Sequence, residues 1–104
     1  MASRIELDEG AREDFDDAFD WYAKRSPAAA LGFASEVDAA IENIVADPER
    51  FAKTYAGCRY CSLKRYPFSV IYYSMPGENP GVRQIIVVAI AHAKRRPGYW
   101  RYRR

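Results

Sequence analysis

The spacing of apolar residues changes once along this chain, and the change limits the folds open to it. After a short alternating stretch at residues 4–7, apolar residues recur every three or four positions up to residue 46, which is typical of amphipathic helices. From residue 59 to residue 92 they alternate or run continuously, which is typical of strands. With 104 residues there is room for one domain with one core. The pattern predicts an α+β fold.

Two helices are predicted in the first half. The first spans residues 11–25 and is capped by Asp8, whose carboxylate can accept hydrogen bonds from free N–H groups. Its apolar stripe contains Phe15, Ala18, Phe19 and Tyr22, and its opposite, solvated face is expected to contain Asp14, Asp17 and Asp20. The second helix begins at Pro27 with Ser26 as N-cap and stops at Asp47, because a residue that precedes proline avoids helical backbone. The short connection predicts an antiparallel helical hairpin.

The strand pattern predicts a small sheet. Short strands are expected at residues 4–7, 59–65 and 67–73, and a longer one at 84–92. Residues 74–81 are rich in Pro and Gly and should join the last two strands as a hairpin. The last strand is apolar along nearly its whole length, so it is predicted to be central. The order β-α-α-β-β-β predicts a helical hairpin on one face of a mostly antiparallel sheet.

Charge is divided unequally between the two halves of the chain. Residues 1–52 carry five basic and thirteen acidic side chains, whereas residues 53–104 carry eleven basic side chains and one acidic one. A basic face indicates an acidic partner, which can be a nucleic acid, an acidic protein or anionic lipid. The longest apolar run, residues 85–91, is too short to span a membrane. The acidic N-terminal segment lacks the apolar region of a signal peptide, so we expect a cytoplasmic protein with reduced thiols.

The last eleven residues differ in composition from the rest. Residues 94–104 contain six basic and three aromatic side chains around a Pro-Gly pair. We therefore expect residues 1–93 to form the domain and residues 94–104 to form a basic aromatic tail outside the core.

Few residues suggest metal or redox chemistry. Cys58 and Cys61 have the spacing of a redox pair, but positions three apart on a strand face opposite sides, so two separate thiols are expected. His92 is the only histidine and ends the last strand. A structural role is the simpler interpretation, and the alternative is a proton donor or acceptor beside the basic surface. Neither a metal nor another cofactor is expected.

Basic residues in the second half are interleaved with aromatic ones. The basic residues of the predicted sheet and the segment after it are Arg59, Lys64, Arg65, Arg83, Lys94, Arg95 and Arg96. They could contact phosphates while tyrosines stack on bases, as in proteins that bind single-stranded nucleic acid. Alternatively, Tyr72 and Tyr73 are packing residues and the arginines pair with the acidic helices of the same chain. The sequence leaves both interpretations open.

Two segments resemble the RelE/ParE superfamily of bacterial toxins, and in particular its members labelled plasmid-stabilisation proteins. These are residues 64–73, KRYPFSVIYY, and residues 87–100, VVAIAHAKRRPGYW. The resemblance implies the RelE/ParE-like fold and the growth-inhibiting toxin of a type II toxin-antitoxin system in the cytoplasm. It also implies a hetero-oligomer with an acidic antitoxin, and such a partner would complement the basic half of this chain.

The superfamily divides by target. RelE-type toxins cleave mRNA in the ribosome without a metal, using Lys, Arg and Tyr side chains. The resemblance places Arg95 at the position of one arginine of that catalytic set and Tyr99 near the position of its C-terminal tyrosine. Arg65, Lys64 or His92 could substitute for missing members of the set. Three positions depart from the RelE pattern, because Tyr60 and Ser62 stand where it has lysines and Ser69 stands where it has an arginine.

ParE-type toxins act on DNA gyrase instead of cutting RNA. The strand end at residues 90–92 and the segment at residues 57–61 are similar to ParE sequences. The sequence therefore slightly favours a ParE-like toxin over a ribosome-dependent endoribonuclease. A third hypothesis is a non-toxic nucleic-acid-binding module with the same basic aromatic surface.

Overall fold

The structure is a computed structural model that describes residues 2–103. Its elements in chain order are β1 (Ala2–Leu7), α1 (Glu9–Ala23), α2 (Pro27–Ala46), the 3-10 turn η1 (Tyr55–Gly57), β2 (Arg59–Ser62), β3 (Phe68–Pro76), β4 (Val82–His92) and the 3-10 turn η2 (Tyr99–Arg103). The predicted order β-α-α-β-β-β is confirmed. The two 3-10 turns were not expected from the sequence.

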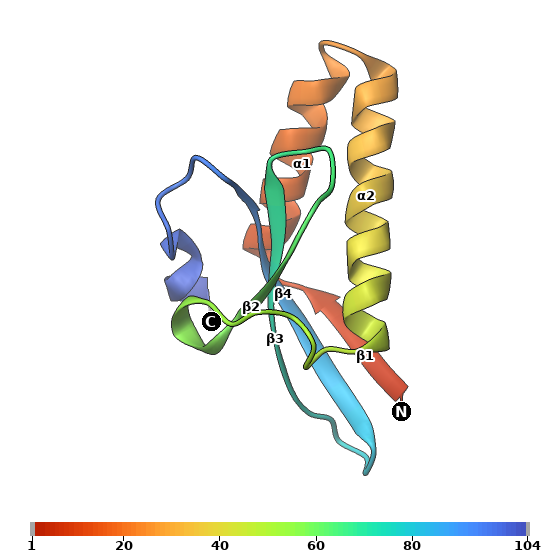
Figure 1. Ribbon diagram of the computed structural model, residues 1–104, viewed down its shortest axis with the longest axis vertical. Helices are drawn as coiled ribbons and strands as arrows, with labels where there is room; N and C mark the ends of the chain where they lie inside the picture. Colours follow the sequence, from red (N-terminus) through yellow and green to blue (C-terminus); the bar gives the residue numbers. More distant parts are fainter. Residues whose placement is uncertain (1, 104) are drawn as a thin grey trace.

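The strands form one sheet in the order β1-β4-β3-β2. Strand β1 runs parallel to β4 with Ile5 opposite Ile85, and the other two pairs are antiparallel. Helices α1 and α2 lie side by side on one face of this sheet (Figure 1). The predictions of a mostly antiparallel sheet, a helical hairpin on one face and a central last strand are therefore confirmed.

Both helices begin at the caps that the sequence predicted. The side chain of Asp8 accepts a hydrogen bond from Gly10 N at 2.9 Å, so α1 starts two residues earlier than expected. The hydroxyl of Ser26 accepts one from Ala29 N at 3.2 Å, and Pro27 follows as the first residue of α2. These bonds satisfy N–H groups that have no partner within the helix.

The main core lies between the helices and the sheet. Its aromatic side chains form a continuous group of ring contacts, made by Phe15, Phe19, Tyr22, Phe33, Tyr66 and Phe68. Tyr72 is fully buried at the other end of this core, and its hydroxyl donates to the carbonyl of Pro48 at 2.8 Å. Burial raises the pKa of Tyr72 to about 12, so this hydroxyl remains a donor at neutral pH.

A β-bulge in β4 changes which way its last residues face. Ile71 of β3 is opposite Ala89 while Tyr72 is opposite Val87, so Val88 is an extra residue. Val88 and Ala89 consequently both pack on the face away from the helices, whereas Ile90 returns to the main core.

The face of the sheet away from the helices carries a second buried cluster, which the C-terminal segment covers. The cluster consists of Cys58, Ile71, Val88, Ala89, Ala91 and Trp100. Trp100 in η2 is only 5% exposed, so the expectation that the tail lies outside the core is wrong for this residue. The physical reason is that two apolar strands leave a second apolar face, and the nearest chain buries it. The basic side chains at 94–96 and 101 stay exposed.

Acidic residues of α2 and the following loop bind parts of the sheet. Lys64 N and Arg65 N donate to the Glu36 carboxylate at 2.8 and 3.0 Å, and this turn ends β2 at residue 62 instead of the expected 65. Arg59 and Arg83 both form ion pairs with Glu49, at 3.1 and 3.0 Å. These two arginines therefore pair within the chain, but with Glu49 in the loop after α2 and not with the acidic helices that were expected.

The packing of the C-terminal segment yields a stability prediction. Replacing Trp100 with Ala removes a buried indole from the second cluster and should lower the free energy of unfolding by about 3 kcal/mol. Tyr102, 86% exposed in the same turn, is the matched control, and Tyr102→Ala should change stability by less than about 0.5 kcal/mol. Urea denaturation measures both, and equal effects would show that the segment does not pack as described.

Candidate functional site

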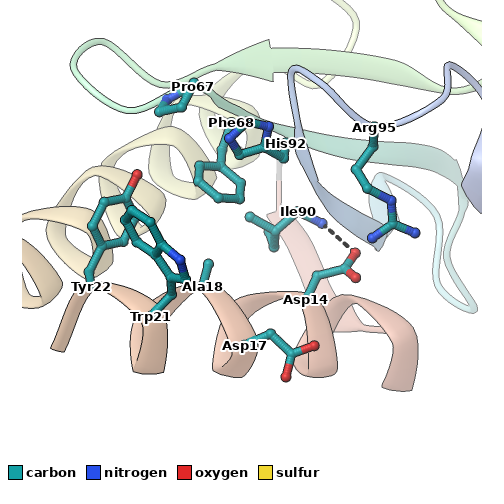
Figure 2. A pocket seen from close by; sticks show the side chains of 10 residues that line it. All are labelled: Asp14, Asp17, Ala18, Trp21, Tyr22, Pro67, Phe68, Ile90, His92 and Arg95. Carbon is teal, nitrogen blue, oxygen red and sulfur yellow. Dashed lines mark hydrogen bonds between the residues drawn. The ribbon is translucent and has the colours of Figure 1, made fainter. Parts of the chain in front are cut away.

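A groove with a cavity volume of about 500 Å³ opens between α1 and the adjoining ends of β3 and β4. Figure 2 shows the ten side chains that line it. The apolar part consists of Ala18, Trp21, Tyr22, Pro67, Phe68 and Ile90, and the charged or titratable part of Asp14, Asp17, His92 and Arg95. Trp21 is 52% exposed, which is unusual for so large an apolar side chain. The groove therefore combines apolar contact area with a few charged groups, as binding sites do.

Asp14 forms one end of this groove, and its side chain is only 10% exposed. Its Oδ2 accepts hydrogen bonds from Ile90 N at 3.1 Å, from the Tyr99 hydroxyl at 3.0 Å and from Arg103 Nη1 at 2.7 Å. Arg103 Nη2 lies 3.4 Å from Oδ1. One carboxylate thus joins α1, β4 and η2.

The position of the ion pair between Asp14 and Arg103 follows from the length of β1. Strand β1 pairs with β4 only as far as Leu7 opposite Val87, and Asp8 N makes the last backbone bond, to Val87 O at 2.8 Å. The remainder of β4 has an open edge on this side. There Asp14 accepts from Ile90 N, and Arg103 Nη1 donates to Val88 O at 3.0 Å. The pair therefore satisfies backbone groups that a longer β1 would have bonded.

The prediction that Asp14 lies on the solvated face of the first helix is wrong. Ala11 and Ala18 are both buried, and Asp14 follows the first by three positions and precedes the second by four, so it shares their stripe. This spacing of three and four residues is the feature of the sequence that indicates burial of Asp14. Arg103 was missed because nothing in the sequence pairs it with a residue 89 positions away.

Three of the four candidate catalytic residues lie near one another. His92 and Arg95 line the groove, and Tyr99 reaches it through the hydrogen bond to Asp14. The guanidinium carbon of Arg95 lies 3.8 Å from the centroid of the Tyr99 ring, in a cation–π contact. Arg65 does not line the groove, and its backbone N–H donates to Glu36 of α2.

The hydrogen bonds restrict what these groups can do. The Tyr99 hydroxyl donates to Asp14, and burial together with that negative charge raises the pKa of Tyr99 to about 12. At neutral pH it is a protonated donor and a poor base. His92 Nδ1 accepts from Lys94 N at 3.0 Å, and the ring packs edge-on against Phe68 at 4.9 Å. His92 thus makes a local hydrogen bond and a ring contact at the end of β4, and its role stays a prediction.

The cysteines do not form a site. Cys58 packs in the second cluster and Cys61 in the main core, so they face opposite sides of the sheet as expected. Both are buried, and burial raises the pKa of the Cys61 thiol. Among residues 2–103 no three side chains of the His, Cys, Asp and Glu types come together as metal ligands. Over the same residues no helix has the length and hydrophobicity needed to cross a bilayer.

The role of Asp14 can be tested by a change of one atom. Asp14→Asn keeps the shape but removes the charge that pairs with Arg103, and it should lower the free energy of unfolding by about 2 kcal/mol. Asp17 lies one turn along the same helix, is exposed and also lines the groove. Asp17→Asn should stay within about 0.5 kcal/mol of the wild type in the same urea titration. A loss at Asp17 as large as that at Asp14 would contradict this assignment.

The raised pKa of Tyr99 predicts an alkaline transition. A neutral phenol favoured in the folded state contributes stability that is complete below pH 10 and is lost as the pH rises toward about 12. In a spectrophotometric titration of the wild type, Tyr72 and Tyr99 should ionise near pH 12. Tyr99→Phe should remove one of these two late-titrating groups. An unchanged number of groups that titrate near pH 12 in Tyr99→Phe would refute the hydrogen bond to Asp14.

Comparison with known proteins identifies the family. A solved structure described as the chromosomal ParDE TA system from P. aeruginosa matches with a TM-score of 0.71 and 21% identity, over 90% of this chain and 98% of that one, which shows the fold. No functionally curated protein matches the sequence. Residues 5–97 match the model of the ParE toxin of the type II toxin-antitoxin system parDE. The chain therefore belongs to the ParE toxin family of type II toxin-antitoxin systems.

Proposed function

We propose that this toxin inhibits growth by acting on DNA gyrase rather than by cutting mRNA. The observation that carries the proposal is the hydrogen bond from the Tyr99 hydroxyl to Asp14, with the raised pKa that accompanies it. Cleavage of RNA without a metal needs a base for the 2′-hydroxyl, cations for the phosphorane and an acid for the leaving oxygen. A tyrosine held as a donor to a carboxylate does not supply the base.

The other positions of the RelE catalytic pattern support the same proposal. Ser62 and Ser69 lie opposite each other on β2 and β3, and their hydroxyl oxygens are 3.0 Å apart. Tyr60 lies on the same face, where the RelE pattern has a lysine. Arg65 does not line the groove, and its backbone N–H donates to Glu36 of α2. The second candidate function is a ribosome-dependent endoribonuclease, in which His92 and Arg95 would have to supply the catalytic groups.

We also propose that the toxin is held inactive in the cytoplasm by an acidic antitoxin, as a hetero-oligomer. Membership of the ParE family supports an antitoxin partner. The exposed cations Lys94, Arg95, Arg96 and Arg101 support an acidic one, because complementary charges steer association. The same cations would support a non-toxic nucleic-acid-binding module, which is the third candidate.

Expression and two enzymatic assays separate these candidates. Induction of this chain alone in a bacterium should arrest growth, and the purified chain should inhibit supercoiling by gyrase while leaving mRNA on translating ribosomes intact. Tyr99→Phe lacks only the hydroxyl, so it should keep most of the gyrase inhibition. Cleavage of ribosome-bound mRNA that falls at least a hundredfold in Tyr99→Phe and Arg95→Ala would favour the endoribonuclease instead. Normal growth at good soluble expression would favour the non-toxic binding module.

A further inference from the structure

Strand β1 lies at one border of the sheet, and its outer edge is unpaired. The strand order gives β1 a neighbour on one side only, and in the part of the chain that the structure describes no strand lies on its other side (Figure 1). Asp8 N donates to β4, so alternate residues of β1 bond to β4 and the others face outward. The outward N–H and C=O groups therefore belong to Ser3, Ile5 and Leu7. The contact of Leu7 O with Arg12 Nε, at 3.4 Å, supports this direction.

The side chains along this edge alternate between charged and apolar. Ile5 is opposite Ile85, a residue of the main core, so it lies on the face that the helices cover, and it is 37% exposed. Arg4 and Glu6 are exposed on the other face. None of the ion pairs within residues 2–103 involves either of them. The edge therefore carries one cation, one apolar residue and one anion in succession.

We propose that this edge pairs with the same edge of a second copy of the chain, so that two sheets join into one across a two-fold axis. Such an axis makes the two β1 strands antiparallel and their contact self-complementary. With the axis at Ile5, the Ile5 residues of the two copies are opposite each other and Ser3 is opposite Leu7 of the second copy. Because these residues face outward, each opposed pair exchanges two backbone hydrogen bonds. Leu7 O can accept one of them in addition to its contact with Arg12, since a carbonyl oxygen has two lone pairs.

The charged residues favour this register over the neighbouring ones. The strands could also pair about Arg4, Glu6 or Leu7, because outward residues still meet outward residues in those registers. Pairing about Arg4 or Glu6 places that charge opposite its own copy, and pairing about Leu7 places Glu6 opposite Asp8, all of which are destabilising. Pairing about Ile5 instead places Arg4 opposite Glu6 on both sides of the axis. These are non-hydrogen-bonded positions, where opposed side chains are closest.

Self-complementary charge is the reason for choosing a second copy as the occupant of this edge. Edges that avoid pairing commonly carry lysines, which would repel each other across a two-fold axis. Strand β1 instead has charges of opposite sign at positions that the axis brings together, and the two Ile5 side chains add an apolar contact on the helical face. No residue of β1 lines the groove, so this contact is separate from it. The inference does not rest on the proposed function.

Sedimentation equilibrium of the intact chain tests whether it dimerises. The average mass should rise with concentration from 11.9 kDa toward twice that value, with a dissociation constant between about 1 μM and 1 mM, as suits so small a contact. Hydrogen exchange of the Ile5 amide should slow by about tenfold or more as the dimer forms, because its N–H gains an acceptor. Exchange of the Glu6 amide, which faces β4, should not depend on concentration.

Charge reversal tests the register. Arg4→Glu and Glu6→Arg each replace two attractive pairs by two repulsive ones, so each should weaken dimerisation by about tenfold. The double variant Arg4→Glu/Glu6→Arg restores both pairs with exchanged signs and should dimerise like the wild type. An equimolar mixture of the two single variants should form mixed dimers in preference to dimers of either variant, since opposite charges then meet at every position.

Lys53→Glu is the matched control for Arg4→Glu. It makes the same change in net charge, and Lys53 is exposed beside β2 at the other edge of the sheet, so the dissociation constant should stay that of the wild type.

Three outcomes would overturn the pairing of β1. These are a mass that stays at 11.9 kDa up to about 1 mM, a dimer that Arg4→Glu weakens no more than Lys53→Glu does, and a double variant that dimerises no better than the single ones. None of these readouts involves growth or gyrase. A monomeric chain that arrests growth would therefore contradict only this inference, and a dimeric chain that leaves growth normal would contradict only the proposed function.

Discussion

The carboxylate of Asp14 fixes the geometry on which the rest of this site depends. Strand β1 is too short to cover the whole of β4, so part of the central strand would have unpaired backbone groups beside α1. Asp14 and Arg103 bond two of those groups directly, at Ile90 N and Val88 O. Because Asp14 belongs to α1 and Arg103 to η2, the same pair holds the helix and the C-terminal segment against the strand. Because both side chains have low exposure, loss of either partner would leave a poorly solvated charge beside the strand.

The β-bulge at Val88 explains why a C-terminal segment is needed at all. It turns two consecutive residues, Val88 and Ala89, onto the face away from the helices, and the apolar area there requires a cover. Trp100 provides that cover, and Gly98 allows the approach because its φ of +76° is in the left-handed region that glycine adopts readily. The bulge also returns Ile90 to the main core and directs its backbone toward Asp14.

Local signals in the sequence were enough to predict the helices and strands. Contacts between residues far apart in the sequence could not be predicted from it. Asp8, Ser26 and Pro27 define the helix starts because capping acts within one turn. Burial of Asp14 was also readable, from its spacing to two alanines. Trp100 and Arg103 could not be placed, because a tail of basic and aromatic residues has the same composition whether it packs or is solvated. The β-bulge at Val88 could not be predicted either, because one extra residue does not disturb a continuous apolar run.

Arg95 connects the groove with the C-terminal segment. Its guanidinium stacks on Tyr99, whose hydroxyl donates to Asp14, and Asp14 in turn holds Arg103. Asp14 also lines the groove and accepts from Ile90 N, so the carboxylate that completes the edge of β4 is shared by the groove and by η2. The groove and the segment that covers the second cluster therefore depend on the same ion pair.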